Sequence, residues 1–141
     1  AAVENPKLVE KISKRFGSQC VTVTIEVNKV DENKWEVFTH NGTKRTNIEV
    51  KEWMKKVIDL GAGEIILNSI EKDGTKNGFD IELINITKNL CSVPFVISGG
   101  LAKTDHINDL ELNGINGICS GTALHYNLMK VKEIKNSLKR K

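Results

Sequence analysis

Residues 64–70 read EIILNSI, a run that contains three consecutive large apolar side chains. An apolar run without alternation is typical of a strand in a parallel sheet, because both faces of such a sheet are covered. A polar loop over 72–78 follows, and then a segment from Asp80 to Leu90 that we expect to be helical. A buried strand that leads into a helix is the repeating unit of α/β proteins.

Three more units of this kind are expected around this one. Their strands are predicted at 20–27, 94–98 and 115–119. Helices are predicted over 50–60, from Thr104 to Gly114, and in a final region that opens at Gly121 and Thr122. The apolar residues that should face inward in this last region are Leu124, Leu128, Val131, Ile134 and Leu138.

Two further elements complete the chain. An N-terminal helix is predicted after Asn5-Pro6, up to Gly17, because proline favours the first helical turn and glycine ends helices. Its apolar face would consist of Leu8, Val9, Ile12 and Phe16. Asn41-Gly42, a preferred pair for tight hairpin turns, separates two β-rich runs, 34–40 and 43–50.

The alternation predicts an α/β protein in which four parallel strands are covered by helices, with a β-hairpin inserted after the first strand. Two architectures fit four strands. One is a small open sheet, and the other is one half of a (β/α)8 barrel, which normally takes about 250 residues. No low-complexity segment divides the chain, so we expect residues 1–141 to form a single domain.

Composition excludes several classes of protein. Aromatic residues make up only 5% of the 141-residue chain, which argues against nucleic-acid binding by base stacking. No apolar run approaches the ~20 residues of a membrane span, and the first ten residues lack signal-peptide features. Three cysteines without a Cys-x-x-Cys pair predict neither a disulfide framework nor a metal site and are typical of the cytoplasm.

Charge is concentrated at the C-terminus. The chain has 21 basic and 18 acidic residues. Residues 130–141 contain six of the basic residues and one of the acidic residues. The remaining 15 basic and 17 acidic residues leave a nearly neutral body. We interpret the basic segment as a last helix whose cations suit the negative end of its dipole, rather than as a nucleic-acid or membrane patch.

Ligands of parallel α/β folds bind at the carboxyl ends of the strands. Two glycine-containing segments are expected there, Ser98-Gly99-Gly100 and Gly121-Thr122. Glycines let backbone amides approach an anion, so a phosphate site is one explanation of the two segments together. Simple loop punctuation explains the pair equally well, and explains either segment alone better. Glu26 and Asp73 are carboxylates expected at the same edge, where acid–base chemistry would need them.

The order of several motifs makes the chain recognisable. The motifs are Ala1–Pro6 (AAVENP), Phe16–Cys20 (FGSQC), Gly61–Ile65 (GAGEI), Asp73–Asp80 (DGTKNGFD) and Ser98–Gly100 (SGG). Together they closely resemble the cyclase subunit of imidazole glycerol phosphate synthase, an enzyme of histidine biosynthesis. The resemblance covers the whole chain but only the C-terminal half of that family, whose fold is a (β/α)8 barrel of two similar halves.

The resemblance implies a reaction. The family joins ammonia to a phosphoribulosyl-formimino-aminoimidazole carboxamide nucleotide and releases imidazole glycerol phosphate and aminoimidazole carboxamide ribotide. A glutaminase partner supplies the ammonia through the opposite end of the barrel, and no metal or organic cofactor is implied. Two aspartates act as general acid and base, and only one of their positions lies in this half.

The resemblance also implies roles for individual residues. Glu26 stands where the family has a catalytic aspartate, so its carboxylate reaches one methylene further. Asp73 belongs to the loop that contacts substrate, and Glu64 resembles a member of the charged ring at the ammonia entrance. The residues that match substrate or phosphate positions are Asn68, Ser69, Gly74, Ser98, Gly99, Gly100, Gly121 and Thr122.

Three functions stay open at this point: half of a cyclase that is inactive alone, a phosphate-binding half barrel without turnover, and a paralogue that delivers ammonia for surface-sugar modification. A half barrel would also expose two strand edges and its inward face, which we expect to include alternate residues of Val21–Val27 and Ile65–Leu67. A homodimer is therefore predicted, since two copies supply eight strands.

Overall fold

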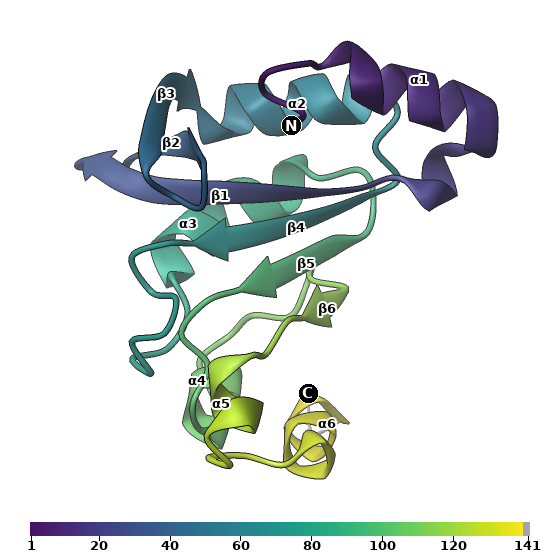
Figure 1. Ribbon diagram of the computed structural model, residues 1–141. Coiled ribbons are helices and arrows are strands. Elements are labelled where there is room, and N and C mark those ends of the chain that lie inside the picture. Colours follow the sequence, from purple (N-terminus) through teal and green to yellow (C-terminus); the bar gives the residue numbers. More distant parts are fainter. Residues whose placement is uncertain (140–141) are drawn as a thin grey trace.

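Six strands form one sheet in the order β3-β2-β1-β4-β5-β6 in the computed structural model, which describes residues 1–139 (Figure 1). Strands β1, β4, β5 and β6 are parallel, whereas β2 and β3 form an antiparallel hairpin beside β1. The predicted parallel strands and inserted hairpin are thus confirmed. The strands are β1 (Thr22–Asp31), β2 (Lys34–Thr39), β3 (Lys44–Glu49), β4 (Glu64–Ser69), β5 (Phe95–Ser98) and β6 (Gly117–Ile118).

Helices occupy the connections, as the alternation predicted. The α-helices are α1 (Lys7–Phe16), α2 (Val50–Asp59), α3 (Ile81–Thr87), α4 (Thr104–Asn108), α5 (Thr122–His125) and α6 (Val131–Lys139). Two short 3-10 helices, η1 (Ser18–Cys20) and η2 (Lys88–Leu90), follow α1 and α3. None of the helices within residues 1–139 is both long enough and apolar enough to cross a bilayer.

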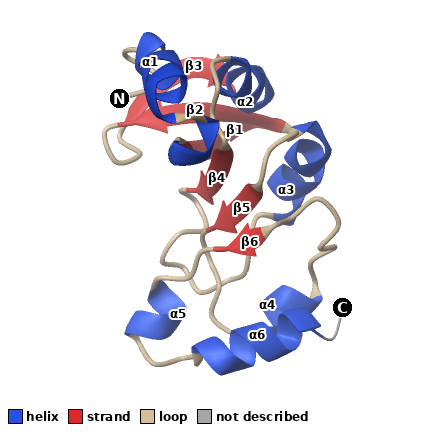
Figure 2. Ribbon diagram, turned by 90° about the vertical axis from the view of Figure 1, so that its right-hand side faces the viewer, coloured by secondary structure: helices blue, strands red, loops and turns tan. Residues whose placement is uncertain are grey.

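One face of the sheet carries the hydrophobic core. Val23 and Ile25 of β1 lie in register with Ile65 and Leu67 of β4, and all four are at most 6% exposed. Figure 2 shows α2 and α3 along this side of the strands. Helix α2 contributes buried side chains that include Trp53, so the apolar residues of strand and helix close a common core.

The opposite face of β1 and β4 is polar and lacks a helical cover in Figure 2. Thr22 and Thr24 are exposed on it, and Ile66 is only partly buried. Alternate residues of Val21–Val27 and Ile65–Leu67 thus line the open face, as expected, and those of β1 are polar. The valines and the isoleucine of β1 that alternate with them are buried on the helix-covered side, where they add apolar contact.

The hairpin changes the edges of the sheet. Strand β2 pairs with β1 from Glu26 to Asp31, so only the N-terminal part of β1 lacks a neighbour on that side. The open edge that was predicted along the whole first strand is thus limited to the part of β1 before Glu26. At the other end of the sheet, β6 has only two residues.

A buried polar cluster attaches the hairpin to the helix layer. Trp35 of β2 is fully buried, and its Nε1 donates a hydrogen bond of 3.0 Å to Asp80 Oδ2. Asp80 also caps α3, because its Oδ1 accepts from the Leu83 amide at 3.0 Å. This one carboxylate joins β2 to the first turn of α3.

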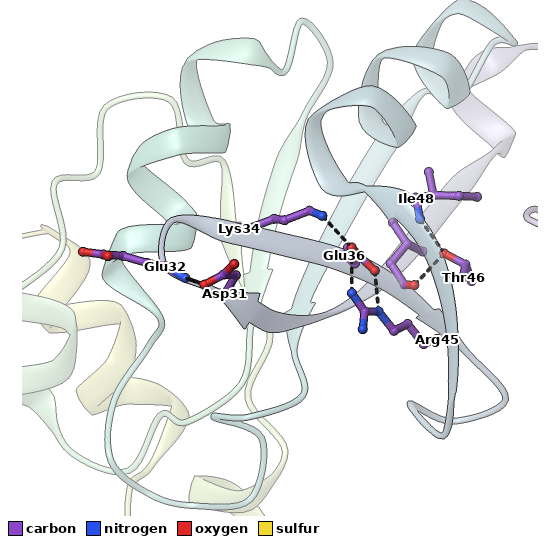
Figure 3. Close-up of polar contacts among 8 residues, drawn as sticks. Asp31, Glu32, Lys34, Glu36, Arg45, Thr46 and Ile48 are labelled. Atoms are coloured by element: carbon purple, nitrogen blue, oxygen red, sulfur yellow. Dashed lines mark hydrogen bonds and ion pairs between the residues drawn. The ribbon is translucent and has the colours of Figure 1, made fainter.

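A second polar cluster lies within the hairpin (Figure 3). Glu36 is 2% exposed and receives two hydrogen bonds from Arg45, at 2.7 and 3.0 Å, while Lys34 lies 3.1 Å away. The hydrogen bonds from Arg45, followed by that from Lys34, lower the pKa of Glu36 to about 2 against the cost of its burial. Glu36 is therefore ionised and fully paired.

The helical predictions at both ends need correction. On α1 only Val9 is buried, whereas Leu8 and Phe16 are 38% and 56% exposed. The last helical region is divided into α5 and α6, and Asn127 between them has a φ of 54°. As a result Leu124, Leu128 and Val131 are exposed instead of facing inward, while Ile134 is buried as predicted. Residues 140 and 141 of the basic segment lie outside the described part of the chain.

Candidate functional site

Three loops meet at a small hollow at the carboxyl edge of the parallel strands. The loop after β4 contributes Asp73, the loop after β5 contributes Ser98 to Leu101, and the segment after β6 contributes Cys119 to Thr122. We call this hollow the cradle. The structure thus brings together both glycine-containing segments and one of the two predicted carboxylates.

Two glycines are required where the loops approach each other. Gly99 and Gly100 have φ values of 102° and 94°, a region that side chains rarely enter. A Cβ on Gly99 would lie 2.8 Å from the Ser69 carbonyl oxygen, and one on Gly100 would overlap the Gly78 carbonyl oxygen. Glycine is therefore required at both positions for the loops to pack against each other, in addition to letting a ligand approach the backbone.

Gly121 differs from these two. Its φ is −101°, and an added Cβ would have no atom within 4 Å. Neither backbone conformation nor packing requires glycine at this position. A larger side chain at 121 would therefore be accommodated without strain, which makes this residue the cradle position where a substitution damages the fold least.

Two buried polar atoms beside the loops have no hydrogen-bond partner among residues 1–139, Asn68 Oδ1 and Ser120 Oγ. Buried polar atoms are nearly always paired, by protein or by water, so such a pair at one edge is unusual. Ser120 lines the cradle. Ser120 follows the last predicted strand, but nothing in the sequence indicates that its hydroxyl lacks a partner within residues 1–139.

The polar face of the sheet presents a row that leads to the cradle. Glu26 of β1 lies in register with Asn68 of β4, which lies in register with Ser98 of β5. Asn68 Nδ2 also contacts Asp73 Oδ2 at 3.5 Å. Glu26 itself lines another hollow, between the N-terminal residues and the hairpin, beside His40. The two predicted carboxylates thus lie in neighbouring hollows, and Asn68 stands between them.

Ser69 does not face the substrate side as predicted. It is 3% exposed, and its hydroxyl lies 3.4 Å from Asp80 Oδ2 on the helix-covered side. Successive side chains of a strand point to opposite faces, so Asn68 and Ser69 cannot both face the cradle. The Ser69 carbonyl still contributes to this edge, because it accepts from the Asp73 amide at 2.9 Å.

The loop after β4 is held from two directions. Within the loop, Thr75 Oγ1 donates to the Lys72 carbonyl at 2.8 Å, and Gly74 is exposed with a φ of 75°. Across the edge, Lys76 Nζ lies 4.5 Å from the centre of the Tyr126 ring at the end of α5. This cation–π contact joins the Asp73 loop to the segment that carries Gly121.

Glu64 lies at the other end of the strands. Its Oε1 accepts from Thr22 Oγ1 at 3.1 Å, and both residues belong to the first register pair of β1 and β4. Glu64 is therefore at the amino edge of the polar face, opposite the cradle. This location is compatible with the expected place of Glu64 at the ammonia entrance.

Comparison with known proteins gives a consistent result. Residues 1–130 match the family described as histidine biosynthesis protein. Proteins named imidazole glycerol phosphate synthase subunit HisF are 39% identical over 141 residues in Endomicrobium trichonymphae and 40% identical over 140 residues in Bacillus cereus (strain G9842). A third, from Corynebacterium glutamicum (strain R), is 37% identical over 145 residues.

These matches cover 99–100% of this chain but only 54–56% of each relative. The chain thus spans about half the length of the curated relatives that it matches.

Proposed function

The chain belongs to the histidine biosynthesis protein family, and we propose that it forms the C-terminal half of a cyclase barrel of the imidazole glycerol phosphate synthase type. Its four parallel strands, each leading to a helix, the first by way of the inserted hairpin, correspond to half of a (β/α)8 barrel. The complete barrel would convert the phosphoribulosyl-formimino-aminoimidazole carboxamide nucleotide and ammonia to imidazole glycerol phosphate and aminoimidazole carboxamide ribotide. We expect this reaction in the cytoplasm.

The observation that carries the proposal is the cradle. Backbone of Ser98–Gly100 and Gly121–Thr122 surrounds one hollow at the carboxyl edge, together with the unpaired hydroxyl of Ser120. Main-chain amides of these two segments would be the donors to an anion in the hollow. A phosphate group would accept from these amides and from Ser120, and its charge suits backbone donors.

Catalysis would depend on Glu26 and Asp73, with Asn68 between them. In this family a carboxylate at the position of Glu26 acts as general acid or base, and the second acid belongs to the other half of the barrel. The loss of one such group typically lowers a rate by about 10²–10⁴-fold, so the chain alone should show negligible turnover. Ammonia from a glutaminase subunit would enter at the amino edge, where Glu64 lies.

A homodimer would cover what the half barrel leaves open. The polar face with Thr24 and Ile66, the free N-terminal part of β1 and the short edge strand β6 would meet their counterparts in a second copy. Helix α1, which carries the exposed Leu8 and Phe16, lies beside the same part of β1 (Figure 1). Two-fold pairing is the commonest way to close such surfaces.

A second function is favoured by one residue. Glutamate at position 26 extends the acid by one methylene, whereas catalytic geometry tolerates only about 0.5 Å of displacement. A paralogue that delivers ammonia for surface-sugar modification would bind a different substrate and suit a longer acid. Enzyme activity of a complete barrel separates the two functions.

The decisive experiment joins this chain to the N-terminal half of the Bacillus cereus relative and measures cyclisation with ammonium salt. We expect turnover only when both halves are present, and a higher rate with Glu26→Asp. A loss of activity in Glu26→Asp would favour the second function, and no turnover in any combination would contradict the proposal.

Anion binding is tested separately. Phosphate should raise the melting temperature of the chain by mass action, and Gly121→Val should abolish the rise without lowering the melting temperature in phosphate-free buffer. Substitution of Gly99 is unsuitable for this purpose, because its positive φ and close contacts would damage the fold. A rise that survives in Gly121→Val would show that phosphate binds elsewhere.

A further inference from the structure

His106 lies directly behind the cradle. It belongs to α4 and is 8% exposed, and its Nδ1 accepts a hydrogen bond of 3.2 Å from the Ala102 amide. Ala102 follows the Ser98–Leu101 segment that lines the cradle. The imidazole therefore holds the end of this segment through a main-chain donor, although it has no contact with the hollow itself.

The same ring also supports the second loop of the cradle. A Cβ on Gly78 would lie 3.3 Å from His106 Cδ2, so the ring is packed against the backbone of this glycine. The Gly78 amide in turn donates to the Gly100 carbonyl at 2.9 Å. The loop after β4 and the loop after β5 thus touch each other at Gly78 and Gly100, and both rest on His106.

The hydrogen bond defines the state of the ring. Since Nδ1 accepts, the neutral ring carries its proton on Nε2. Burial, and then the positive charge of Lys103, lower the pKa of His106, while Asp109 and Asp105 act in the opposite direction. The loop after β4 presents the uncharged Gly78 to the ring, and the inward residues of α6, Ile134 and Ser137, are not titratable.

We propose that His106 is a positioning residue for the cradle: its neutral imidazole fixes the Gly99–Gly100 backbone through the Ala102 amide, and protonation releases this backbone. A proton on Nδ1 would face the Ala102 N–H, and two donors cannot pair, so one of them must move. The inference rests on the proposed anion site in one respect, that the positioned backbone serves to bind an anion.

The ring's link to the loop is tested without any ligand. In amide NMR spectra recorded from about pH 8 to about pH 5, the signals of Ala102 and Gly100 should shift with the midpoint of the His106 ring. In His106→Asn these signals should stay constant, because the asparagine Oδ1 replaces Nδ1 as acceptor and does not titrate. Signals of Ala102 that do not follow the ring in the unmodified chain would overturn the proposal.

Its effect on binding is tested with sulfate, which remains a dianion throughout this range. Sulfate affinity should fall about tenfold from pH 7.5 to pH 5 in the unmodified chain, the loss expected for one hydrogen bond. It should be independent of pH in His106→Asn and about tenfold weaker at both pH values in His106→Leu.

His125→Asn is the matched control. This histidine ends α5, in the segment that follows Gly121 and Thr122, and it is not part of the hydrogen bond that holds the Ala102 amide. The fall in affinity at low pH should therefore persist in His125→Asn. A fall that persists in His106→Asn would overturn the role of His106. Failure of sulfate to bind at any pH would contradict the anion site, while the amide titration would still decide whether His106 controls the loops.

Discussion

The hairpin and the cradle both contain buried polar groups, but only those of the hairpin are paired. Glu36 is bonded to Arg45 and Lys34, and Trp35 is bonded to Asp80. At the cradle, Asn68 Oδ1 and Ser120 Oγ have no partner among residues 1–139. A fully paired cluster stabilises a fold, whereas unpaired atoms at an edge are available to a ligand. Substitutions in the two regions should therefore have different consequences.

The largest effect is expected from Asp80→Ala. The variant removes the helix cap of α3 and leaves the buried Trp35 N–H without an acceptor, so the free energy of unfolding should fall by about 2–4 kcal/mol. Urea denaturation followed by tryptophan fluorescence measures the change.

Asp80→Asn is the matched control for this effect. The amide retains one acceptor for the Leu83 N–H but offers a donor to Trp35. The free energy of unfolding of Asp80→Asn should therefore lie between those of the unmodified chain and Asp80→Ala. If Asp80→Ala changed the free energy of unfolding by less than about 0.5 kcal/mol, the hairpin would not depend on this cluster.

A smaller effect concerns the pH dependence of the hairpin. The pKa of Glu36 is lowered from 4.5 to about 2 in the folded chain, chiefly by its hydrogen bonds to Arg45. Its contribution to stability is therefore complete above pH 4.5 and is lost as the pH falls toward 2. Between these pH values, the stability difference between the unmodified chain and Glu36→Gln should shrink.

Urea midpoints at several pH values measure this difference, and the exposed Glu32→Gln serves as the control. The control should follow the unmodified chain throughout. Parallel curves for Glu36→Gln and the unmodified chain would mean that the ion cluster has no role in acid stability.

The smallest effect on stability is expected at the cradle. Ser120→Ala removes a hydroxyl that has no hydrogen-bond partner within residues 1–139, so the free energy of unfolding should stay constant or rise by up to about 1 kcal/mol. Sulfate affinity should nevertheless fall about tenfold, because the hydroxyl would donate to the anion.

Ser92→Ala provides the comparison, since Ser92 is exposed and lines a groove beside α2 instead of the cradle. Calorimetric titration with sulfate should give the same affinity for this variant as for the unmodified chain. A loss of stability in Ser120→Ala without a loss of sulfate affinity would mean that Ser120 stabilises the fold, as the hairpin residues do, and does not bind the anion.

Much of the candidate site was predictable, since Ser98–Gly100 and Gly121–Thr122 follow neighbouring strands and do line one hollow. The substrate-side position of Ser69 was implied by the family resemblance, and the alternation of side chains along β4 places the residue on the opposite face from Asn68. The hydrogen bond between His106 and the Ala102 amide could not be expected from sequence spacing alone.

The sequence by itself determined the order of strands and helices, the hairpin at Asn41-Gly42 and the glycine segments, because periodicity and turn chemistry act over a few residues. Only the tertiary structure decided which side of β1 meets the helices and where the last helix is divided. It also decided that Asp80 bonds to Trp35, 45 residues away. These outcomes depend on contacts between distant segments, which compete for the same apolar surface and the same hydrogen-bond partners.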